Sequence, residues 1–147
     1  MSTYLVTGGA GFIGSNIAEE LVRRGEETIV LDDLSTGNER NMESFRSKIT
    51  FIHGDIRDAR TVRTAVDGVD YVLHQAALAS VPRSIEDPLL VNDVNVGGTL
   101  VVLEEARRAD VKRLVYAASS SAYGDSEVMP KTEEMTCLLY TSDAADE

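Results

Sequence analysis

The chain has 147 residues, of which 43% are hydrophobic and 27% are charged, a composition typical of one globular domain with a buried core. Its formal net charge of -11 makes it a poor candidate for binding nucleic acid or an anionic membrane. No stretch approaches the length of apolar sequence that a membrane-spanning helix needs. The first strand begins within a few residues of Met1, so we expect no signal peptide.

A glycine-rich turn lies near the N-terminus. Residues 7–14 read T-G-G-A-G-F-I-G, between a predicted strand, Thr3–Thr7, and a predicted amphipathic helix, Phe12–Arg24. A strand, a glycine turn and a helix in this order are typical of a dinucleotide-binding site, whereas the glycines alone would equally suit a plain turn. The sequence therefore predicts a phosphate-binding turn at the start of the chain.

Each glycine of this turn has a separate expected role. Gly8 would allow a tight turn out of the strand, Gly11 would let a diphosphate approach the backbone, and Gly14 would let the helix pack against the sheet. The helix N-terminus would offer unpaired N–H groups and a partial positive charge to the phosphates.

A second predicted strand, Thr28–Leu31, ends in Asp32, which is 18 positions after Gly14. This spacing is close to that of the acid that binds an adenosine ribose, although a loop aspartate could also stand there. A carboxylate would accept hydrogen bonds from the ribose hydroxyls and repel a 2′-phosphate, so it favours NAD over NADP. The polar stretch 35–41 is the expected loop beside the adenosine.

The third predicted strand, Ile49–His53, leads into a turn at residues 54–58. In a dinucleotide-binding fold, Asp55 and Ile56 would stand over the adenine, with Ile56 supplying an apolar face. Asp58 is the expected N-cap of a short helix over residues 61–66.

The fourth predicted strand, Val69–His74, is followed by Gln75, Ala76, Ala77 and Leu78. Small residues just past the carboxyl end of a strand permit close approach of a ligand, here the second half of the dinucleotide.

A long helix is predicted from Asp87-Pro88 to about Ala109, with aspartate as N-cap and proline in the first turn. The two glycines at 97 and 98 cost about 1 kcal/mol each in a helix. A close contact with the sheet or a cofactor loop would explain them, and Asn95 could brace that loop. A helix that merely tolerates the glycines is the alternative.

The fifth predicted strand, Arg113–Ala117, precedes a serine triplet at 119–121 whose hydroxyls could reach a bound substrate, although such a triplet is also typical of a turn. Five alternating strands and helices predict an α/β fold, a Rossmann-type doubly wound parallel sheet of order 3-2-1-4-5. With a single cysteine, Cys137, and two distant histidines, His53 and His74, we expect no disulfide and no metal site. Both histidines are expected to pack at strand ends, and the cysteine usage fits a cytoplasmic protein.

Over residues 3–136 the chain resembles the extended short-chain dehydrogenase/reductase family, and within it the NAD-dependent nucleotide-sugar epimerases of the UDP-glucose 4-epimerase type. The resemblance rests on the glycine turn together with six further motifs, D-D-L-S-T-G at 32–37, G-D-I-R-D at 54–58, H-Q-A-A at 74–77, S-V-P-R-S at 80–84, N-V-G-G-T at 95–99 and S-S-S-A-Y-G at 119–124.

The resemblance implies a site for each part of the reaction. The residues that it assigns to NAD lie at the strand ends, namely Gly8, Gly11, Phe12, Ile13, Gly14, Asp32, Asp33, Leu34, Ser35, Gly37, Asp55, Ile56, Gln75, Ala76, Ala77 and Asn95. Ser119 matches the catalytic hydroxyl, and Ser120, Ser80 and Val81 match contacts to a UDP-sugar substrate. A homodimer is implied for the parent protein.

The implied reaction is a transient oxidation at the sugar C4. A tyrosine phenolate takes the proton of the 4-hydroxyl while hydride passes to NAD, and the hydride returns to the other face of the keto sugar. A lysine four residues after the tyrosine lowers the pKa of that tyrosine. The related 4,6-dehydratases carry Thr-Asp-Glu where this chain has three serines, and the sugar-acid decarboxylases keep a glutamate at Ser121, so epimerisation is favoured over elimination.

The chain departs from the family after residue 136. Tyr140 is followed four residues later by Ala144 rather than by the family's lysine, and the C-terminal sugar-nucleotide domain has no counterpart. Residues 137–147 resemble a translated sequencing adaptor and are interpreted as a non-native tail after an incomplete NAD-binding domain, 1–136; a divergent native tail is the alternative. We therefore expect an inactive N-terminal fragment, with a non-catalytic NAD-binding module or a dehydratase or reductase half as alternative functions.

Overall fold

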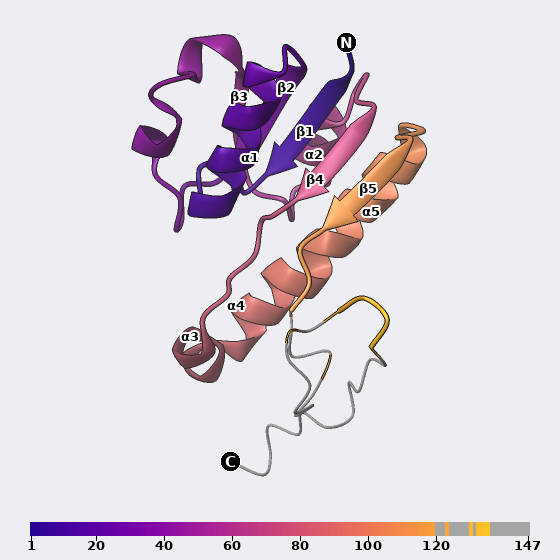
Figure 1. Cartoon of the computed structure of the whole chain (residues 1–147). Coiled ribbons are helices and arrows are strands. Elements are labelled where there is room, and N and C mark those ends of the chain that lie inside the picture. Colours follow the sequence, from indigo (N-terminus) through magenta and orange to yellow (C-terminus); the bar gives the residue numbers. More distant parts are fainter. Residues whose placement is uncertain (120–122, 124–129, 131, 136–147) are drawn as a thin grey trace. The chain divides into compact units, whose positions relative to one another are not determined.

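The computed structural model describes residues 1–119, 123, 130 and 132–135, and the chain divides into two units, Met1–Tyr116 and Ala117–Glu147. The first unit is a parallel sheet of five strands in the order β3-β2-β1-β4-β5 (Figure 1). The strands are β1 (Thr3–Thr7), β2 (Glu27–Asp32), β3 (Thr50–His53), β4 (Tyr71–His74) and β5 (Arg113–Tyr116). The predicted doubly wound sheet and its strand order are confirmed.

The strand register brings the carboxyl ends of all five strands to one edge of the sheet. Thr7 at the end of β1 is paired with Leu31 of β2 and with His74 of β4. Asp32 is paired with His53 of β3. The loops that follow these strands therefore leave the sheet side by side, which is the condition for a shared ligand site.

Helices flank the sheet. They are α1 (Phe12–Arg23), α2 (Ala59–Ala65), α3 (Val81–Glu86), α4 (Pro88–Asn92) and α5 (Thr99–Arg108), with short 3₁₀ turns η1 (Glu39–Met42) and η2 (Arg46–Lys48) and a π-helical segment η3 (Asp93–Gly98). No helix in the described part of the chain is both long enough and apolar enough to cross a membrane.

The predicted helix signals act where they were expected. Gly25, with a φ of +78°, follows the C-cap of α1, a backbone conformation that suits glycine. Asp58 accepts the backbone N–H of Arg60 at the start of α2, and Asp87 accepts that of Leu90 at the start of α4.

The long helix predicted after Asp87 differs from the expectation in its middle. Helices α4 and α5 are joined through η3 with helical backbone at both junctions, but residues 93–98 are wound as a π-helix. Such segments are rare and frequently mark functional sites. The short helix α3 before it was not predicted; Ser80 is its N-cap and accepts the N–H of Arg83.

Alternating side chains of the strands supply two separate cores. Leu5 and Leu31 point to the face covered by α2 and α5, whereas Val6 and Val30 point to the face covered by α1. All four are completely buried. The two-residue period of the strands thus fixes which helices cover which face, as expected for buried parallel strands.

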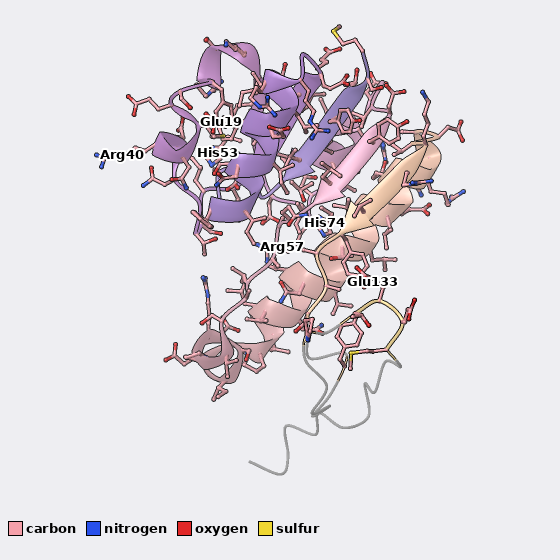
Figure 2. All side chains as sticks on the ribbon, in the orientation of Figure 1. Glu19, Arg40, His53, Arg57, His74 and Glu133 are labelled. Carbon is pink, nitrogen blue, oxygen red and sulfur yellow. The ribbon has the colours of Figure 1, made fainter. Side chains whose placement is uncertain are left out.

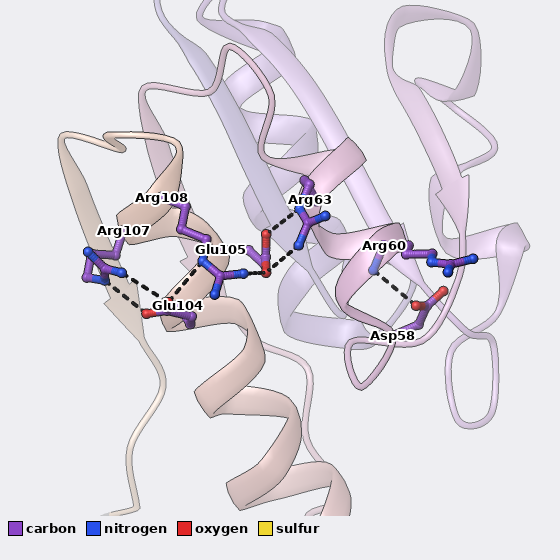
Figure 3. A network of polar contacts seen from close by, with 7 residues as sticks. All are labelled: Asp58, Arg60, Arg63, Glu104, Glu105, Arg107 and Arg108. Atoms are coloured by element: carbon purple, nitrogen blue, oxygen red, sulfur yellow. Dashed lines mark hydrogen bonds and ion pairs between the residues drawn. The ribbon is translucent and has the colours of Figure 1, made fainter.

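A buried carboxylate locks α5 onto α2 (Figure 3). Glu105 is 3% exposed and accepts two hydrogen bonds from Arg63, at 2.8 and 3.1 Å, and one from Arg108 at 2.7 Å. The hydrogen bonds from Arg63 lower the pKa of Glu105 and its burial raises it; the hydrogen bonds dominate, so the pKa is lowered. These contacts fix the position of α5 relative to α2, and η3 leads directly into α5.

Candidate functional site

The glycine turn packs against the segment that follows β4. Gly8 has a φ of +67°, and a Cβ on it would lie 2.7 Å from the backbone nitrogen of Ala76. Its own N–H donates to the carbonyl of Leu31 at 2.8 Å. The tight turn predicted at Gly8 is confirmed, and it also joins the ends of β1, β2 and β4.

Gly14 serves the turn itself rather than the sheet. A Cβ on Gly14 would collide with the carbonyl oxygen of Gly8 and lie 2.8 Å from the Cα of Gly9. The close packing predicted for Gly14 is therefore present, but its partner is the glycine turn instead of a strand.

The N-terminus of α1 is open in the way that a diphosphate requires. Gly11 is the N-cap, no side chain caps the helix, and its first turn carries no acidic residue. A Cβ on Gly11 would meet only the carbonyl oxygen of Gly8, at 3.2 Å. The first N–H groups of a helix have no partner within it, and here they lie beside the exposed side chains of Phe12 and Ile13, which are 83% and 61% exposed.

Asp32 is built into the same turn. It is 7% exposed; its Oδ2 accepts the N–H of Ala10 at 2.9 Å and its Oδ1 accepts the N–H of Leu34 at 2.8 Å. Each carboxylate oxygen has a second lone pair, so two acceptor positions remain for ribose hydroxyls. The predicted contact to the ribose stays a prediction, while the bracing of two backbone segments by Asp32 is an additional role.

The loop after β2 is shaped by contacts to Asp32. Leu34 has a φ of +60°, an uncommon conformation for a branched side chain. Asp33 accepts the N–H of Ser35 at 2.9 Å. A Cβ on Gly37 would lie 2.8 Å from Asp32 Oδ1, so this position requires glycine if the loop is to pass so close to the carboxylate.

The turn after β3 is held by an ion pair. Arg57 contacts Asp55 at 2.6 Å and Asp93 of η3 at 2.9 Å, and Figure 2 shows Arg57 at the edge of the sheet where the strands end. The hydrogen bonds from Arg57 lower the pKa of Asp55, which keeps the carboxylate charged.

The side chain of Ile56, expected to offer an apolar face to the adenine, is largely buried. Ile56 is 6% exposed and belongs to the core, and a Cβ on Gly98 would lie 2.6 Å from its δ-methyl group. The side chain fills the space that Gly98 leaves on η3. The close contact predicted for the helix glycines is thereby confirmed, while the contact of Ile56 with the adenine stays a prediction.

The segment after β4 is braced by Asn95, as expected. Asn95 Oδ1 accepts the N–H of Leu78 at 2.8 Å, and Asn95 Nδ2 donates to the carbonyl of Leu78 at 3.2 Å. The N–H of Gln75 donates to the carbonyl of Thr7 at 3.1 Å. Ala77 between them is exposed and Ala76 is half-buried, so a small-residue surface faces outward at this strand end.

The residues predicted to contact substrate are spread over both units. Ser80 caps α3 and Val81 is 73% exposed. Ser119 is exposed and lies in the second unit, and Ser120 lies outside the described residues. Their roles stay predictions.

The two histidines differ (Figure 2). His74 is 3% exposed at the end of β4, where burial lowers its pKa, so the expected packing is confirmed. His53 lies at the end of β3, where its ring is stacked with that of Phe51 and its Nε2 lies 3.1 Å from the carbonyl oxygen of Asp33. It is at a strand end as expected, but it is exposed. Within the described residues no cluster of three or more possible metal ligands occurs.

Four polar residues of the site could not be given a function in it from the sequence. Thr7, His74 and Thr99 are joined by hydrogen bonds next to the segment after β4, and Arg57 joins the turn after β3 to η3. A signal was present, because Thr7 and His74 are polar residues at the carboxyl ends of two otherwise apolar strands that are neighbours in the predicted order.

Together these residues fit a dinucleotide. An uncapped helix N-terminus stands beside a glycine without side-chain obstruction, and a buried carboxylate with free lone pairs lies on the adjacent strand. Glycine turn, acid and small-residue segment all lie at the carboxyl edge of one sheet, where open α/β folds bind their ligands.

Comparison with known proteins agrees with this geometry. The sequence model of the NAD dependent epimerase/dehydratase family matches residues 4–143, and the chain belongs to this family. The match continues through seven of the eleven residues interpreted above as a tail, since it ends at 143; the boundary at 136 stays a prediction.

Relatives and solved structures cover nearly all of this chain. The UDP-glucose 4-epimerase of Streptomyces lividans is 44% identical over 133 residues, 88% of this chain and 40% of the relative. The UDP-glucose 4-epimerase of Stenotrophomonas maltophila, solved with bound NAD and formylated UDP-arabinopyranose, superposes with a TM-score of 0.85 at 33% identity and covers 94% of this chain and 43% of that one. The dTDP-glucose 4,6-dehydratase of Streptomyces venezuelae gives 0.84 at 36% identity, covering 92% and 45%. The chain thus spans about two fifths of the length of these proteins.

Proposed function

We propose that this chain is the NAD-binding part of a nucleotide-sugar 4-epimerase that interconverts UDP-sugars. The observation that carries the proposal is the N-terminus of α1, which no side chain caps at Gly11, together with the buried carboxylate of Asp32, which binds the glycine turn just before that helix. The family match and the NAD bound in the Stenotrophomonas relative support the choice of cofactor.

The chain's own groups divide the binding of the cofactor between them. The N–H groups at the start of α1 would hold the diphosphate, because they are unpaired and the helix end carries a partial positive charge. Asp32 would accept the ribose hydroxyls and exclude a 2′-phosphate. Asp55, kept charged by Arg57, would accept a hydrogen bond from the adenine amino group.

The segment from Gln75 to Ala77 would support the nicotinamide half. Bound there, NAD would supply a reversible acceptor for the hydride of the sugar C4. Ser119 would hydrogen-bond the reacting oxygen, and Ser120, Ser80 and Val81 would contact the sugar nucleotide. The phenolate that takes the proton, and the lysine that lowers the pKa of its tyrosine, would come from sequence that this chain does not contain.

The choice of epimerase over dehydratase depends on the serines at 119–121. The Streptomyces venezuelae dehydratase superposes on this chain as well as the epimerases do, so the fold does not distinguish the two reactions. Elimination of water needs an additional acid and base, and neither is present among the three hydroxyls.

The product formed by the full-length protein tests the proposal. With NAD and UDP-galactose, we expect UDP-glucose, an isomer of unchanged mass, and no product lacking water. The 147-residue chain alone is expected to show no turnover. A dehydrated keto sugar would identify a dehydratase instead, and a full-length protein that binds NAD without converting any nucleotide sugar would identify a non-catalytic module.

A further inference from the structure

A chain of hydrogen bonds runs beneath the segment after β4, from one cofactor loop to η3. Thr7 Oγ1 lies 2.6 Å from His74 Nδ1, and His74 Nε2 lies 3.0 Å from Thr99 Oγ1. At its two ends, the N–H of Ala76 donates to Thr7 Oγ1 at 3.3 Å, and Thr99 Oγ1 donates to the carbonyl of Asn95 at 2.7 Å. The imidazole in the middle is 3% exposed.

The direction of every hydrogen bond in this chain follows from its last acceptor. The carbonyl of Asn95 can only accept, so the single hydroxyl proton of Thr99 is directed to it, and Thr99 Oγ1 must accept from His74. The proton of the neutral ring is therefore on Nε2. Nδ1 is then an acceptor for the hydroxyl of Thr7, whose oxygen in turn accepts the N–H of Ala76.

A protonated ring does not fit this arrangement. With protons on both nitrogens, Thr7 would have to accept from His74 as well as from Ala76, and its own hydroxyl proton would lose its partner. The ring contacts hydroxyl groups of residues on β1 and α5. On the neighbouring strand β5, the residue paired with His74 is Tyr116, which is 58% exposed. Asp93 is the charged residue of η3, and it is paired with Arg57. Burial alone lowers the pKa of His74, in agreement with the geometry.

We propose that His74 is a positioning residue of the NAD site, which as a neutral Nε2–H imidazole fastens the segment after β4 to η3. One end of the hydrogen-bond chain fixes Ala76, and Asn95 at the other end fixes Leu78 through its side chain. The segment between them is thereby held in the one conformation offered to the nicotinamide half. The role in binding rests on the proposed function, whereas the tautomer can be measured without any ligand.

Substitutions at Thr99 separate positioning from simple packing. Thr99→Val keeps the shape but leaves the Nε2–H without an acceptor, so we expect NAD affinity by calorimetry to fall about tenfold, the equivalent of one lost hydrogen bond. Thr99→Ser retains the hydroxyl and is expected to stay within about threefold of the wild type. Thr64→Val is the matched control, because Thr64 Oγ1 also donates to the carbonyl four residues before it, Arg60, at 3.1 Å.

Nitrogen NMR of the imidazole rings tests the tautomer directly. We expect the His74 ring to carry its proton on Nε2 and to stay neutral just below pH 6.5, the ordinary pKa of a histidine. His53→Gln removes the only other histidine in the sequence and so assigns the signals. In the unfolded chain the His74 ring has a pKa near 6.5, so it binds a proton at pH values where the buried ring of the folded chain stays neutral. The free energy of unfolding therefore keeps its full value above pH 6.5 and decreases as the pH is lowered from 6.5 toward the pKa of His74 in the folded chain. This decrease should persist in His53→Gln and disappear in His74→Gln.

A proton on Nδ1, or Thr99→Val binding NAD like the wild type while Thr64→Val does the same, would overturn the positioning role. A wild-type chain that binds no NAD would overturn the proposed function instead. The tautomer and the pH dependence of unfolding would then still decide whether the hydrogen-bond chain exists. If His74→Gln does not fold, the pair Thr99→Val and Thr99→Ser gives the same decision.

Discussion

The loop after β2 and the segment after β4 lie at the same edge of the sheet but are held in different ways. The first is organised by Asp32 at the end of β2 itself, whose carboxylate accepts the N–H of Leu34, two residues later, and the N–H of Ala10 in the glycine turn, 22 residues earlier. The second has no such local brace in the described residues. Its conformation depends on Asn95 and Thr99, which come from a helix about 20 residues later in the sequence.

This difference suggests that the two halves of the cofactor site respond differently to mutation. Changes in the loop after β2 should act on that loop and on the contacts of Asp32. Changes in η3 should act at a distance, because that segment contacts the turn after β3 through Gly98 and Asp93 as well as the segment after β4 through Asn95.

The largest loss of stability is expected from Asn95→Ala. It removes both partners of Leu78 and leaves a partly buried N–H and carbonyl unpaired, which costs about 2 kcal/mol. Urea denaturation measures the loss, and Asn92→Ala, an exposed asparagine on the same helix, is the control with an expected change below about 0.5 kcal/mol. Equal effects of the two substitutions would contradict the remote brace.

Gly37→Ala is expected to have an intermediate effect. The added methyl group would lie 2.8 Å from Asp32 Oδ1 and 2.9 Å from the Cβ of Ala10, and such overpacking costs about 1–2 kcal/mol. Because Asp32 must shift, NAD affinity should fall in parallel with stability. Gly97→Ala is a control in which the added atom meets only Asp93 Oδ1, at 3.3 Å. A stable Gly37→Ala protein with unchanged NAD affinity would argue against the predicted place of the loop beside the adenosine.

Gly11→Ala should separate binding from folding. Its backbone, with a φ of -74° and a ψ of 172°, suits any residue, so the free energy of unfolding should fall only by the cost of alanine at an N-cap, at most about 1 kcal/mol. The methyl group would nevertheless stand where a diphosphate must approach, and NAD affinity should fall about tenfold or more. Calorimetry and thermal melts on the same sample give both quantities. Unchanged affinity would exclude the N-terminus of α1 as the phosphate site.

Asp93→Asn should have the smallest effect. Asp93 is 62% exposed and contributes one contact to Arg57, which keeps its shorter contact with Asp55. Exposed ion pairs contribute about 0–1 kcal/mol, so urea denaturation should detect a change of about 0.5 kcal/mol at most. A loss comparable to that of Asn95→Ala would mean that η3 depends on this ion pair more than on its buried contacts.

The first half of the site could be predicted because its determinants are local in sequence. The glycine turn, β1, α1 and Asp32 lie within the first 32 residues, and strand order followed from alternating strands and helices. The helix caps at Asp58 and Asp87 were equally local. Each of these motifs carries its own sequence pattern, so it can be recognised even though the contact of Asp32 with Ala10 spans 22 residues.

The second half could be predicted only in outline. Helical periodicity indicated a helix through residues 93–98 but not its π-helical winding, which accompanies the close packing of Gly98 on Ile56. The burial of Ile56 against Gly98 was likewise not predicted. The burial of Glu105 and the contacts of His74 depend on residues 25 to 67 positions away, and no local pattern carries that information.

Calorimetric titration of the wild-type chain with NAD and, separately, with NADP tests the central proposal most directly. We expect saturable binding of NAD and at least about tenfold weaker binding of NADP, because the 2′-phosphate would approach the buried carboxylate of Asp32. Equal affinity for the two nucleotides, or a folded chain that binds neither, would contradict the assignment of this sheet edge as an NAD site.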